Sequence, residues 1–326
     1  MSISKPFYSV KITAVDCGFA LAINGCVEEE LDHAEAYNQE LPINQWLKNG
    51  QNTIDMHMLN IPNYATGKLA LLETGKLTLD LFVKEYGTDK KILLSSTHYD
   101  SSKLKRNNSE LREVIFNDTE TLFQSIATST KKVSSSIINN ELIAKDNGEY
   151  QTGEYTLTEG ITKSLQISHS VILPCPFPEY KFFQADELTY HEALSDEQWE
   201  ATRADLIKAY QPIWNAIKDD DSEAMVQLFS ARCSEYDQAF YTEEGQNLKE
   251  LIAHLRSIIH DDVWTQFQLD IEDVDVAVAY NSKITWLHTW ELTLVHAIKF
   301  KHTTAELEKR IPFMLSKFDG KWEIVR

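Results

Sequence analysis

The chain has 326 residues, of which 43% are hydrophobic, and its formal net charge at pH 7 is -19. This length predicts about two domains, each able to bury a core without help from metals or disulfides. The acidic balance argues against nucleic acid and anionic membranes as partners, because both require a basic face. It favours solubility or a basic protein partner instead.

The ends and the cysteines predict a cytoplasmic protein without bound metal. The N-terminal residues lack the charged start and apolar run of a secretory signal, and no stretch approaches the ~20 apolar residues of a membrane span. Cys17, Cys26, Cys175 and Cys233 have no C-x-x-C spacing, which favours buried free thiols. No dinucleotide, nucleotide, zinc-protease or α/β-hydrolase motif occurs, so no cofactor is predicted.

The stretch from Ile23 to Met58 organises the first half of the chain. Residues 19–23 alternate in size and end at Asn24-Gly25, a pair that suits a tight hairpin turn. After an acidic excursion, Gly50 precedes a second strand whose apolar side chains share one face.

Similar patterns extend the β structure to about residue 173. Alternation predicts strands over residues 8–12, 77–84, 92–97, 137–144, 150–157 and 161–173. Residues 125–136, rich in Ser and Thr, are expected to form a loop or an edge strand, and Asn147-Gly148 a turn. Three prolines between residues 174 and 178 end the sheet, because proline cannot donate to a ladder.

The order of a strand, an Asn-Gly turn, a long excursion, a Leu-x-x-Gly-x-Asn segment and a second strand resembles the galactose-binding-like jelly rolls. Those domains occur as accessory domains of glycosidases. The resemblance covers residues 7–86 and implies a β-sandwich. It implies no sugar site, because the ligand loops of those domains have no residue-by-residue match here.

Beyond residue 194 the apolar period changes from 2 to 3.6. Ser195 and Gln198 have the spacing of a capping box, and the residues that follow predict an amphipathic helix bent at Pro212. The acidic run at residues 219–221 suits the start of a second helix, and Gly245 separates it from a third.

Strands follow the three helices. Residues 267–271 and 274–280 have opposite parity, which predicts a bulge or bend near Glu272. Residues 285–301 are predicted as one long strand. Its even positions are mostly apolar or aromatic and its odd positions carry the charges, so the even face is expected to point toward the helices. Two final strands, 311–318 and 322–325, flank an Asp-Gly hairpin turn.

Three helices followed by a curved antiparallel sheet that ends in IPFMLSKFDGKWEIV resemble the nuclear-transport-factor-two-like cone. Ketosteroid isomerase and the SnoaL-like cyclases share that fold, and the resemblance covers residues 197–326. It implies helices laid over a concave sheet that encloses a pocket. The ligand-binding residues of such a pocket would be Tyr210, Trp214, Trp286, His288, Trp290 and His296. The catalytic Asp-Tyr pair of the family has no match at corresponding places, so no catalytic residue is assigned.

The two histidines of the predicted strand do not indicate a metal site. His288 and His296 lie eight residues apart on one strand face, ~26 Å by strand rise, which is too far to share one ion. Each fits a hydrogen-bonded histidine of a core or a pocket wall. The tryptophans likewise fit a core as well as a ligand platform.

The sequence thus predicts an α+β chain of two domains. An N-terminal antiparallel β-sandwich spans residues 1–183, a linker spans 184–194, and a cone-like domain of three helices and a curved antiparallel sheet spans 195–326. The predicted function is that of a non-catalytic binding or regulatory module. One alternative is an enzyme that uses the cone pocket on a small apolar substrate, with His288 as general base. Another is an acidic immunity or inhibitor protein that caps a basic toxin.

The predicted partners follow from these alternatives. They are a small apolar ligand or a basic protein, and the sheet of the cone is the surface through which a homodimer would form.

Overall fold

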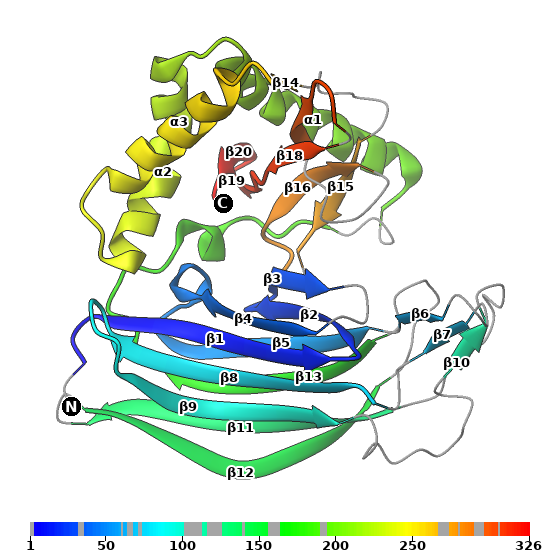
Figure 1. The fold of residues 1–326 in the computed structure, drawn as a ribbon, viewed down its shortest axis with the longest axis vertical. Coiled ribbons are helices and arrows are strands. Elements are labelled where there is room, and N and C mark those ends of the chain that lie inside the picture. The colour runs from blue at the N-terminus through cyan, green and yellow to red at the C-terminus, as the bar shows by residue number, and fades with distance from the viewer. Residues whose placement is uncertain are drawn as a thin grey trace. The chain divides into compact units, whose positions relative to one another are not determined.

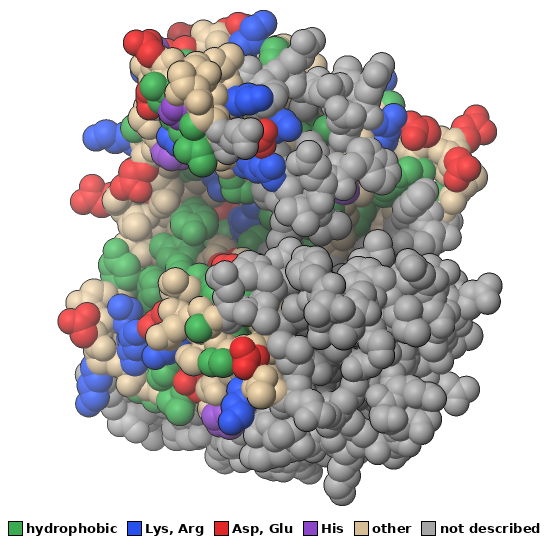
Figure 2. Space-filling model, turned by 45° about the vertical axis from the view of Figure 1, so that its right-hand side comes forward, with side chains coloured by type: hydrophobic (Ala, Val, Ile, Leu, Met, Phe, Trp, Pro, Cys, Tyr) green, Lys and Arg blue, Asp and Glu red, His purple; other side chains and the backbone are tan. Residues whose placement is uncertain are grey.

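The computed structural model describes residues 3–31, 36–59, 61–63, 68–70, 74–100, 113–115, 126–138, 141–155, 164–189, 194–266, 274–279, 281–289, 297–305 and 307–326. The fold is α+β, with β-sheets in the N-terminal half and three helices and further antiparallel sheets in the C-terminal half (Figure 1). The chain divides into two compact units, Met1–Phe177 and Pro178–Arg326. Acidic and basic side chains are intermixed on the described surface (Figure 2). Within the described ranges, no helix is both long and apolar enough to cross a membrane.

The first sheet of the N-terminal unit has the strand order β4-β1-β8-β9, and every neighbouring pair is antiparallel. Its strands are β1 (Pro6–Val15), β4 (Tyr37–Pro42), β8 (Lys76–Glu85) and β9 (Lys91–Asp100). Alternate side chains of β1 and β8 are at most 3% exposed: Tyr8, Val10, Ile12, Ala14, Leu77, Leu79, Leu81 and Val83. The alternation predicted for these strands is therefore confirmed, and it leaves the opposite face to polar side chains.

The second sheet has six strands in the order β12-β11-β13-β5-β2-β3. These are β2 (Gly18–Ile23), β3 (Cys26–Leu31), β5 (Gly50–Leu59), β11 (Ile126–Ile138), β12 (Glu141–Tyr155) and β13 (Ser164–Leu173). All pairs are antiparallel except β11 with β13, which run parallel. A small third sheet contains β6 (Ile61–Asn63), β7 (Lys68–Ala70) and β10 (Glu113–Ile115).

Two predictions fail in this second sheet. Residues 126–136 belong to strand β11, which pairs with β12 along its length and with β13 over residues 131–134, so this stretch is neither a loop nor an edge strand. Strand β12 also continues through Asn147-Gly148, where a turn was predicted. The partners of Lys131 and Val133 are Tyr150 and Asp146, so the Asn-Gly pair lies in a register irregularity between them. Extra residues on one strand bulge outward without reversing the chain.

The stretch from Ile23 to Met58 contains the predicted hairpin turn. Asn24 and Gly25 have φ values of 51° and 76°, and Ile23 pairs with Cys26 on the other strand. The side chain of Asn24 donates to Trp46 O at 2.7 Å and accepts from Thr53 N at 2.9 Å. The turn is thereby tied both to the short helix η1 (Asn44–Trp46) and to β5.

The C-terminal unit begins its regular structure with three helices, α1 (Asp196–Lys218), α2 (Ser222–Phe240) and α3 (Gln246–Ile259). The predicted capping box is present, since Gln198 N donates to Ser195 Oγ and Ser195 N donates to Gln198 Oε1. Helix α1 continues through Pro212. Asp221 caps α2 by accepting hydrogen bonds from the backbone N–H groups of residues 223 and 224.

Two antiparallel sheets complete this unit, in the orders β14-β17-β18 and β15-β16-β19-β20. Their strands are β14 (Trp264–Gln266), β15 (Val274–Val278), β16 (Thr285–Thr289), β17 (Ile298–His302), β18 (Glu308–Ile311), β19 (Leu315–Phe318) and β20 (Lys321–Ile324). One apolar core joins the helices to both sheets and includes Leu206, Ile213, Phe229, Leu255, Leu287, Phe300 and Leu315.

The prediction of one long strand over residues 285–301 is wrong. Ala297 N donates to Leu287 O at 3.1 Å, whereas an extended chain would separate these residues by roughly 33 Å. The chain therefore turns back, and β16 and β17 belong to different sheets. The predicted strand 311–318 is likewise interrupted between β18 and β19, where Pro312 directly follows the last residue of β18. The predicted strand 267–271 and the bulge near Glu272 lie outside the described residues.

The segment that precedes α1 hydrogen-bonds within the C-terminal unit. Asp186 N donates to Lys317 O at 2.8 Å, and Leu188 N donates to Ser282 O at 2.6 Å. Lys283 Nζ donates to Ala185 O at 2.8 Å. The sequence assigns these residues to a linker over 184–194, and here several of them contact β19 and the start of β16. Whether each unit folds alone stays a prediction.

The turn between β19 and β20 offers a clean test of backbone strain. Gly320 has φ +78°, and a Cβ built there meets no atom within 4 Å in the described part of the chain. We therefore expect Gly320→Ala to lower the free energy of unfolding by about 1 kcal/mol, from backbone strain alone. Gly320→Asn should cost less, because asparagine tolerates positive φ. Chemical denaturation of the three proteins measures this, and equal stability of the Ala variant would contradict it.

Candidate functional site

Tyr210, one of the predicted pocket residues, is part of the packed interior. It is 1% exposed. Its hydroxyl donates to Phe313 O and accepts from Leu287 N at 3.3 Å, so it ties α1 to β16 and to the segment before β19. Phe229 stacks on Phe313 with ring centroids 4.9 Å apart and planes 3° apart. The hydroxyl expected to meet a ligand instead bonds backbone groups that burial would leave unsatisfied.

In strand β16 the odd-numbered residue Leu287 faces the helices, and the even-numbered residues do not. Leu287 is fully buried in the core shared with α1, α2 and α3, and its cross-strand partner Val276 belongs to the same core. Because side chains alternate along a strand, Trp286 and His288 lie on the opposite face of the sheet. Both are buried, at 4% and 8% exposed. The prediction that the even face points toward the helices is therefore wrong for β16.

The same prediction holds for β17. Ile298 and Phe300 are buried in the shared core, while Lys301 is exposed. The parity of the inward face thus changes between β16 and β17, as the chain reversal between them allows.

The six predicted ligand-binding residues are not shown to form one pocket. Tyr210 lies on the helix side of β16, and Trp286 and His288 lie on its other side. Trp214 is half-buried against the core, with Lys218 Nζ 4.9 Å from its ring centroid. Trp290 and His296 lie outside the described residues.

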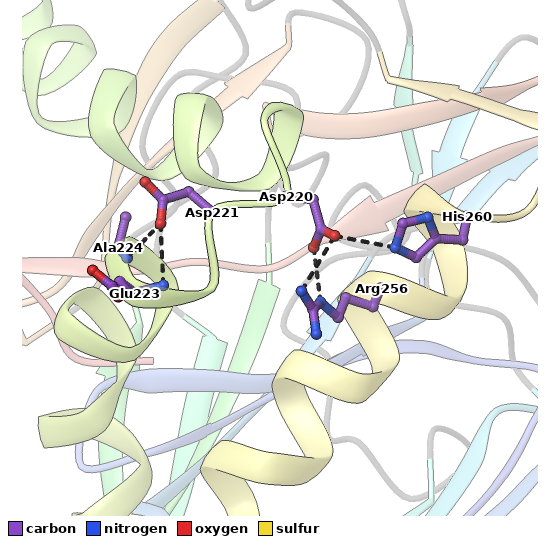
Figure 3. A network of polar contacts seen from close by, with 6 residues as sticks. All are labelled: Asp220, Asp221, Glu223, Ala224, Arg256 and His260. Carbon is purple, nitrogen blue, oxygen red and sulfur yellow. Dashed lines mark hydrogen bonds and ion pairs between the residues drawn. The ribbon is translucent and has the colours of Figure 1, made fainter.

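A cluster of polar side chains joins the α1–α2 turn to the end of α3 (Figure 3). Asp220 has a positive φ of 48°, and its carboxylate accepts from Arg256 Nε at 2.8 Å and lies 3.1 Å from His260 Nε2. The neighbouring Asp221 points the other way and caps α2. The hydrogen bond from Arg256 holds the pKa of Asp220 below its usual range, against the opposing effect of burial. The cluster orders two helix ends.

This pKa shift predicts a pH dependence. Because the folded pKa of Asp220 lies below the ~3.9 of an unfolded Asp, its contribution to stability is complete above that pH and is lost as pH falls through the folded pKa. Asp220→Asn, which keeps the tolerance of positive φ, should lower the free energy of unfolding by roughly 0.5–1 kcal/mol at pH 7. The difference from wild type should shrink below about pH 4. Urea denaturation across this range measures it, and a difference that grows toward low pH would contradict it.

The carboxylate of Asp237 stabilises the connection between α2 and α3. It is 3% exposed and accepts from Thr242 Oγ1 at 2.8 Å, Gly245 N at 2.7 Å and Asn247 N at 3.0 Å. Burial opposes its ionisation, but these hydrogen bonds outweigh that effect and lower its pKa. The carboxylate thus fixes the α2–α3 connection and caps α3, where Gly245 supplies no side chain.

A further group of polar side chains lies on one face of the sheet β4-β1-β8-β9, on the side away from its buried alternate residues. We call this surface the outer face. It comprises Phe7, Ser9, Lys11, Thr13, Asn38, Glu40, Lys76, Thr78, Asp80, Phe82, Lys84, Lys91, Leu93, Ser96 and His98. The register aligns them in rows across the four strands. Asn38, Thr13, Thr78 and His98 form one row, and Glu40, Lys11, Asp80 and Ser96 form the next.

Hydrogen bonds tie these rows together. Ser96 Oγ donates to Asp80 Oδ1 at 2.5 Å and lies 3.2 Å from His98 Nε2, while His98 Nδ1 lies 3.2 Å from Thr78 Oγ1. Glu40 accepts from Lys91 Nζ at 2.6 Å, a contact that joins the two edge strands of the sheet. Burial opposes the ionisation of Glu40, but hydrogen bonds from Lys91 and Ser9 outweigh it and lower its pKa.

The Ser96-His98 pair brings a hydroxyl and an imidazole together. The hydrogen bonds around the pair fix the positions of these side chains and do not favour nucleophilic catalysis. The Ser96 proton is directed to Asp80, and Thr78 holds the far side of the imidazole. An acyl-transfer site also needs donors aimed at the oxyanion. Backbone N–H groups of strands lie in the plane of the sheet and not above its face, so this surface lacks that arrangement among its backbone groups.

Apolar groups lie beside the polar rows. Leu93 is 51% exposed. Lys84 Nζ lies 5.1 Å from the Phe7 ring centroid, and Lys91 Nζ lies 5.9 Å from that of Phe82. Basic side chains are grouped on the N-terminal unit at the lower left of Figure 2. The sequence indicates that one side of each strand is polar and does not predict this surface, because only the strand order shows which polar residues become neighbours.

No group of three or more His, Cys, Asp or Glu side chains in the described ranges is arranged to hold a metal ion. The described cysteines, 17, 26, 175 and 233, are buried free thiols, as predicted.

No family model, curated protein or solved structure matches the chain. The resemblances to the galactose-binding-like jelly roll and to the nuclear-transport-factor-two-like cone therefore stay predictions. What the structure does contain is a region of β-sheets followed by three helices and further antiparallel sheets. A function has to be argued from the surfaces themselves.

Proposed function

We propose that the chain is a non-catalytic binding protein and that the outer face is its binding surface. The observation that supports this most is the set of side-chain hydrogen bonds on the outer face. One group joins Glu40 to Ser9 and Lys91, and another joins Asp80 through Ser96 and His98 to Thr78. Side chains that are already ordered lose less conformational entropy when a ligand arrives, which favours binding. The exposed Leu93 beside them adds apolar contact area.

The other two readings gain less support. The enzyme alternative used the cone pocket with His288 as general base and tryptophans packing the ligand. His288 is 8% exposed and lies on the face of β16 away from Tyr210, and Trp290 lies outside the described residues. An acidic inhibitor of a basic toxin draws support from the net charge of -19 alone. No described surface localises that charge into a partner site, so the alternative stays a prediction.

A thermal-shift screen of saccharides, peptides and organic acids tests the proposal. Compounds that raise the melting temperature of the wild type should fail to raise that of Leu93→Asp, because a carboxylate in place of this exposed apolar side chain disrupts contact with the outer face. Leu307→Asp is the matched control, since Leu307 is 58% exposed on the C-terminal unit. Ligands that still stabilise Leu93→Asp fully would place the binding surface elsewhere.

A further inference from the structure

We infer that the ligand of the outer face is an acidic oligosaccharide, a chain of sugars that carry carboxylate groups. This inference rests on the proposed function and specifies its ligand. Some hydrogen-bonding groups of the outer face are already bonded to one another, and the groups that are left determine which ligand can bind.

The acceptors of the outer face are engaged internally. Glu40 accepts from Ser9 Oγ at 2.7 Å and from Lys91, and Asp80 accepts from Ser96. The side-chain oxygen of Asn38 accepts from Thr13 Oγ1 at 3.4 Å. A ligand that offered mainly donors would have to share these oxygens with the internal donors.

Donors, by contrast, remain available. Lys11 lies in register between Glu40 and Asp80, yet both carboxylates are bonded to other groups. In the described part of the chain Lys11, Lys76 and Lys84 have no ion pair within 4.0 Å, and the amide nitrogen of Asn38 has no hydrogen bond. Lysine has donors and no acceptor, so the ligand must supply acceptors, and ionised ones give the stronger bonds.

The three lysines that have no ion pair among the described residues are spaced for an extended ligand. Lys76 and Lys84 lie eight residues apart on β8, and Lys11 on β1 is level with Asp80, midway between them. At the rise of an antiparallel strand, each step is roughly 13 Å. A small anion could meet one of these ammonium groups, whereas a chain lying along the strands meets all three.

The remaining features favour a sugar chain over other polyanions. Sugar rings present apolar C–H faces, which suit Leu93, and hydroxyl groups, which suit the side-chain amide of Asn38. Single-stranded nucleic acid needs aromatic rings on which bases stack, but Lys91 lies over Phe82 and Lys84 over Phe7. An extended peptide is typically recognised through a sheet edge, and the outer face offers the flat of the sheet.

The test measures binding of an oligogalacturonate to the full chain by calorimetry at low salt. Its methyl ester, which has the same sugar chain without the charges, is the paired probe. Lys11→Ala and Lys84→Ala should each weaken oligogalacturonate binding about tenfold, and binding should weaken further as salt is raised. Lys249→Ala, which removes an exposed lysine on α3, should leave binding unchanged. Circular dichroism checks that each variant is folded.

The other outcomes overturn the inference in distinguishable ways. If the methyl ester binds as tightly and Leu93→Asp abolishes its binding, the ligand is a neutral sugar, and the outer face remains the binding surface. If poly-glutamate binds as tightly as oligogalacturonate, the sugar class is wrong and only the charge is recognised. If neither galacturonate probe binds, the ligand class is wrong, and the thermal-shift comparison of Leu93→Asp with Leu307→Asp judges the proposed function separately.

Discussion

Leu287→Glu is expected to unfold the C-terminal unit. The side chain of Leu287 is fully buried in the core formed with all three helices, next to Tyr210 and Val276. A carboxylate there must be buried without a partner or must take up a proton, and we expect a loss of more than about 4 kcal/mol. Circular dichroism at the helix wavelength and a thermal melt would measure the loss.

Thr265→Glu is the matched control for this substitution. Thr265 lies on β14 of the same unit, is exposed, and is paired across the strands with Lys301. A glutamate at this position should change stability by less than about 1 kcal/mol. A Leu287→Glu protein that melts like the wild type would mean that the odd side of β16 does not face the helices.

A fragment that starts at Pro178 is expected to fold, and one that starts at Ser195 is expected to lose most of its stability. Tyr180 and Phe182 are at most 1% exposed, and the guanidinium of Arg326 lies 3.8 Å from the Tyr180 ring centroid and 4.8 Å from that of Phe182. Removing these two rings takes away apolar contacts and a cation-π partner. Each large aromatic is worth roughly 3–5 kcal/mol in a core, against a total stability of about 5–15 kcal/mol.

Cooperative thermal melts of the two fragments measure this difference. A full-chain Phe182→Ala protein provides a check that does not depend on cutting the chain, and it should be destabilised by several kcal/mol, as for a ring removed from a core. Equal stability of the two fragments would contradict this expectation and support the linker predicted for residues 184–194.

Local signals predicted local structure well. Period-two patterns placed β1 and β8, the Asn24-Gly25 and Asp319-Gly320 pairs gave hairpin turns with positive φ, and Ser195 with Gln198 gave a capping box. Each of these is decided by residues that are close in sequence, through sterics or a short-range hydrogen bond.

The failures involve partners that are distant in sequence. Residues 285–301 keep an apolar even face throughout, yet the chain reverses within them, because Ala297 bonds back to Leu287. The Ser- and Thr-rich β11 becomes an interior strand through its pairing with β12 and β13. The periodicity of a sequence does not show which strands pair with one another, because that depends on residues that are distant in the chain.

The candidate site shows the same limit. Tyr210 was correctly placed on an apolar helix face, but its hydroxyl bonds Phe313, which is 103 residues away. The rows of the outer face likewise combine β1, β4, β8 and β9, which are contiguous only in the folded sheet. The sequence could indicate which side of each strand is polar, but not which polar groups satisfy one another and which remain for a ligand.

Hydrogen exchange of the full chain with and without oligogalacturonate shows where the ligand binds. Binding on the outer face should slow exchange in peptides from β1, β8 and β9, and should leave exchange in peptides from α1 and β16 unchanged. Slower exchange in α1 and β16 with no change in the sheet β4-β1-β8-β9 would contradict it, because the ligand would then occupy the interior of the C-terminal unit.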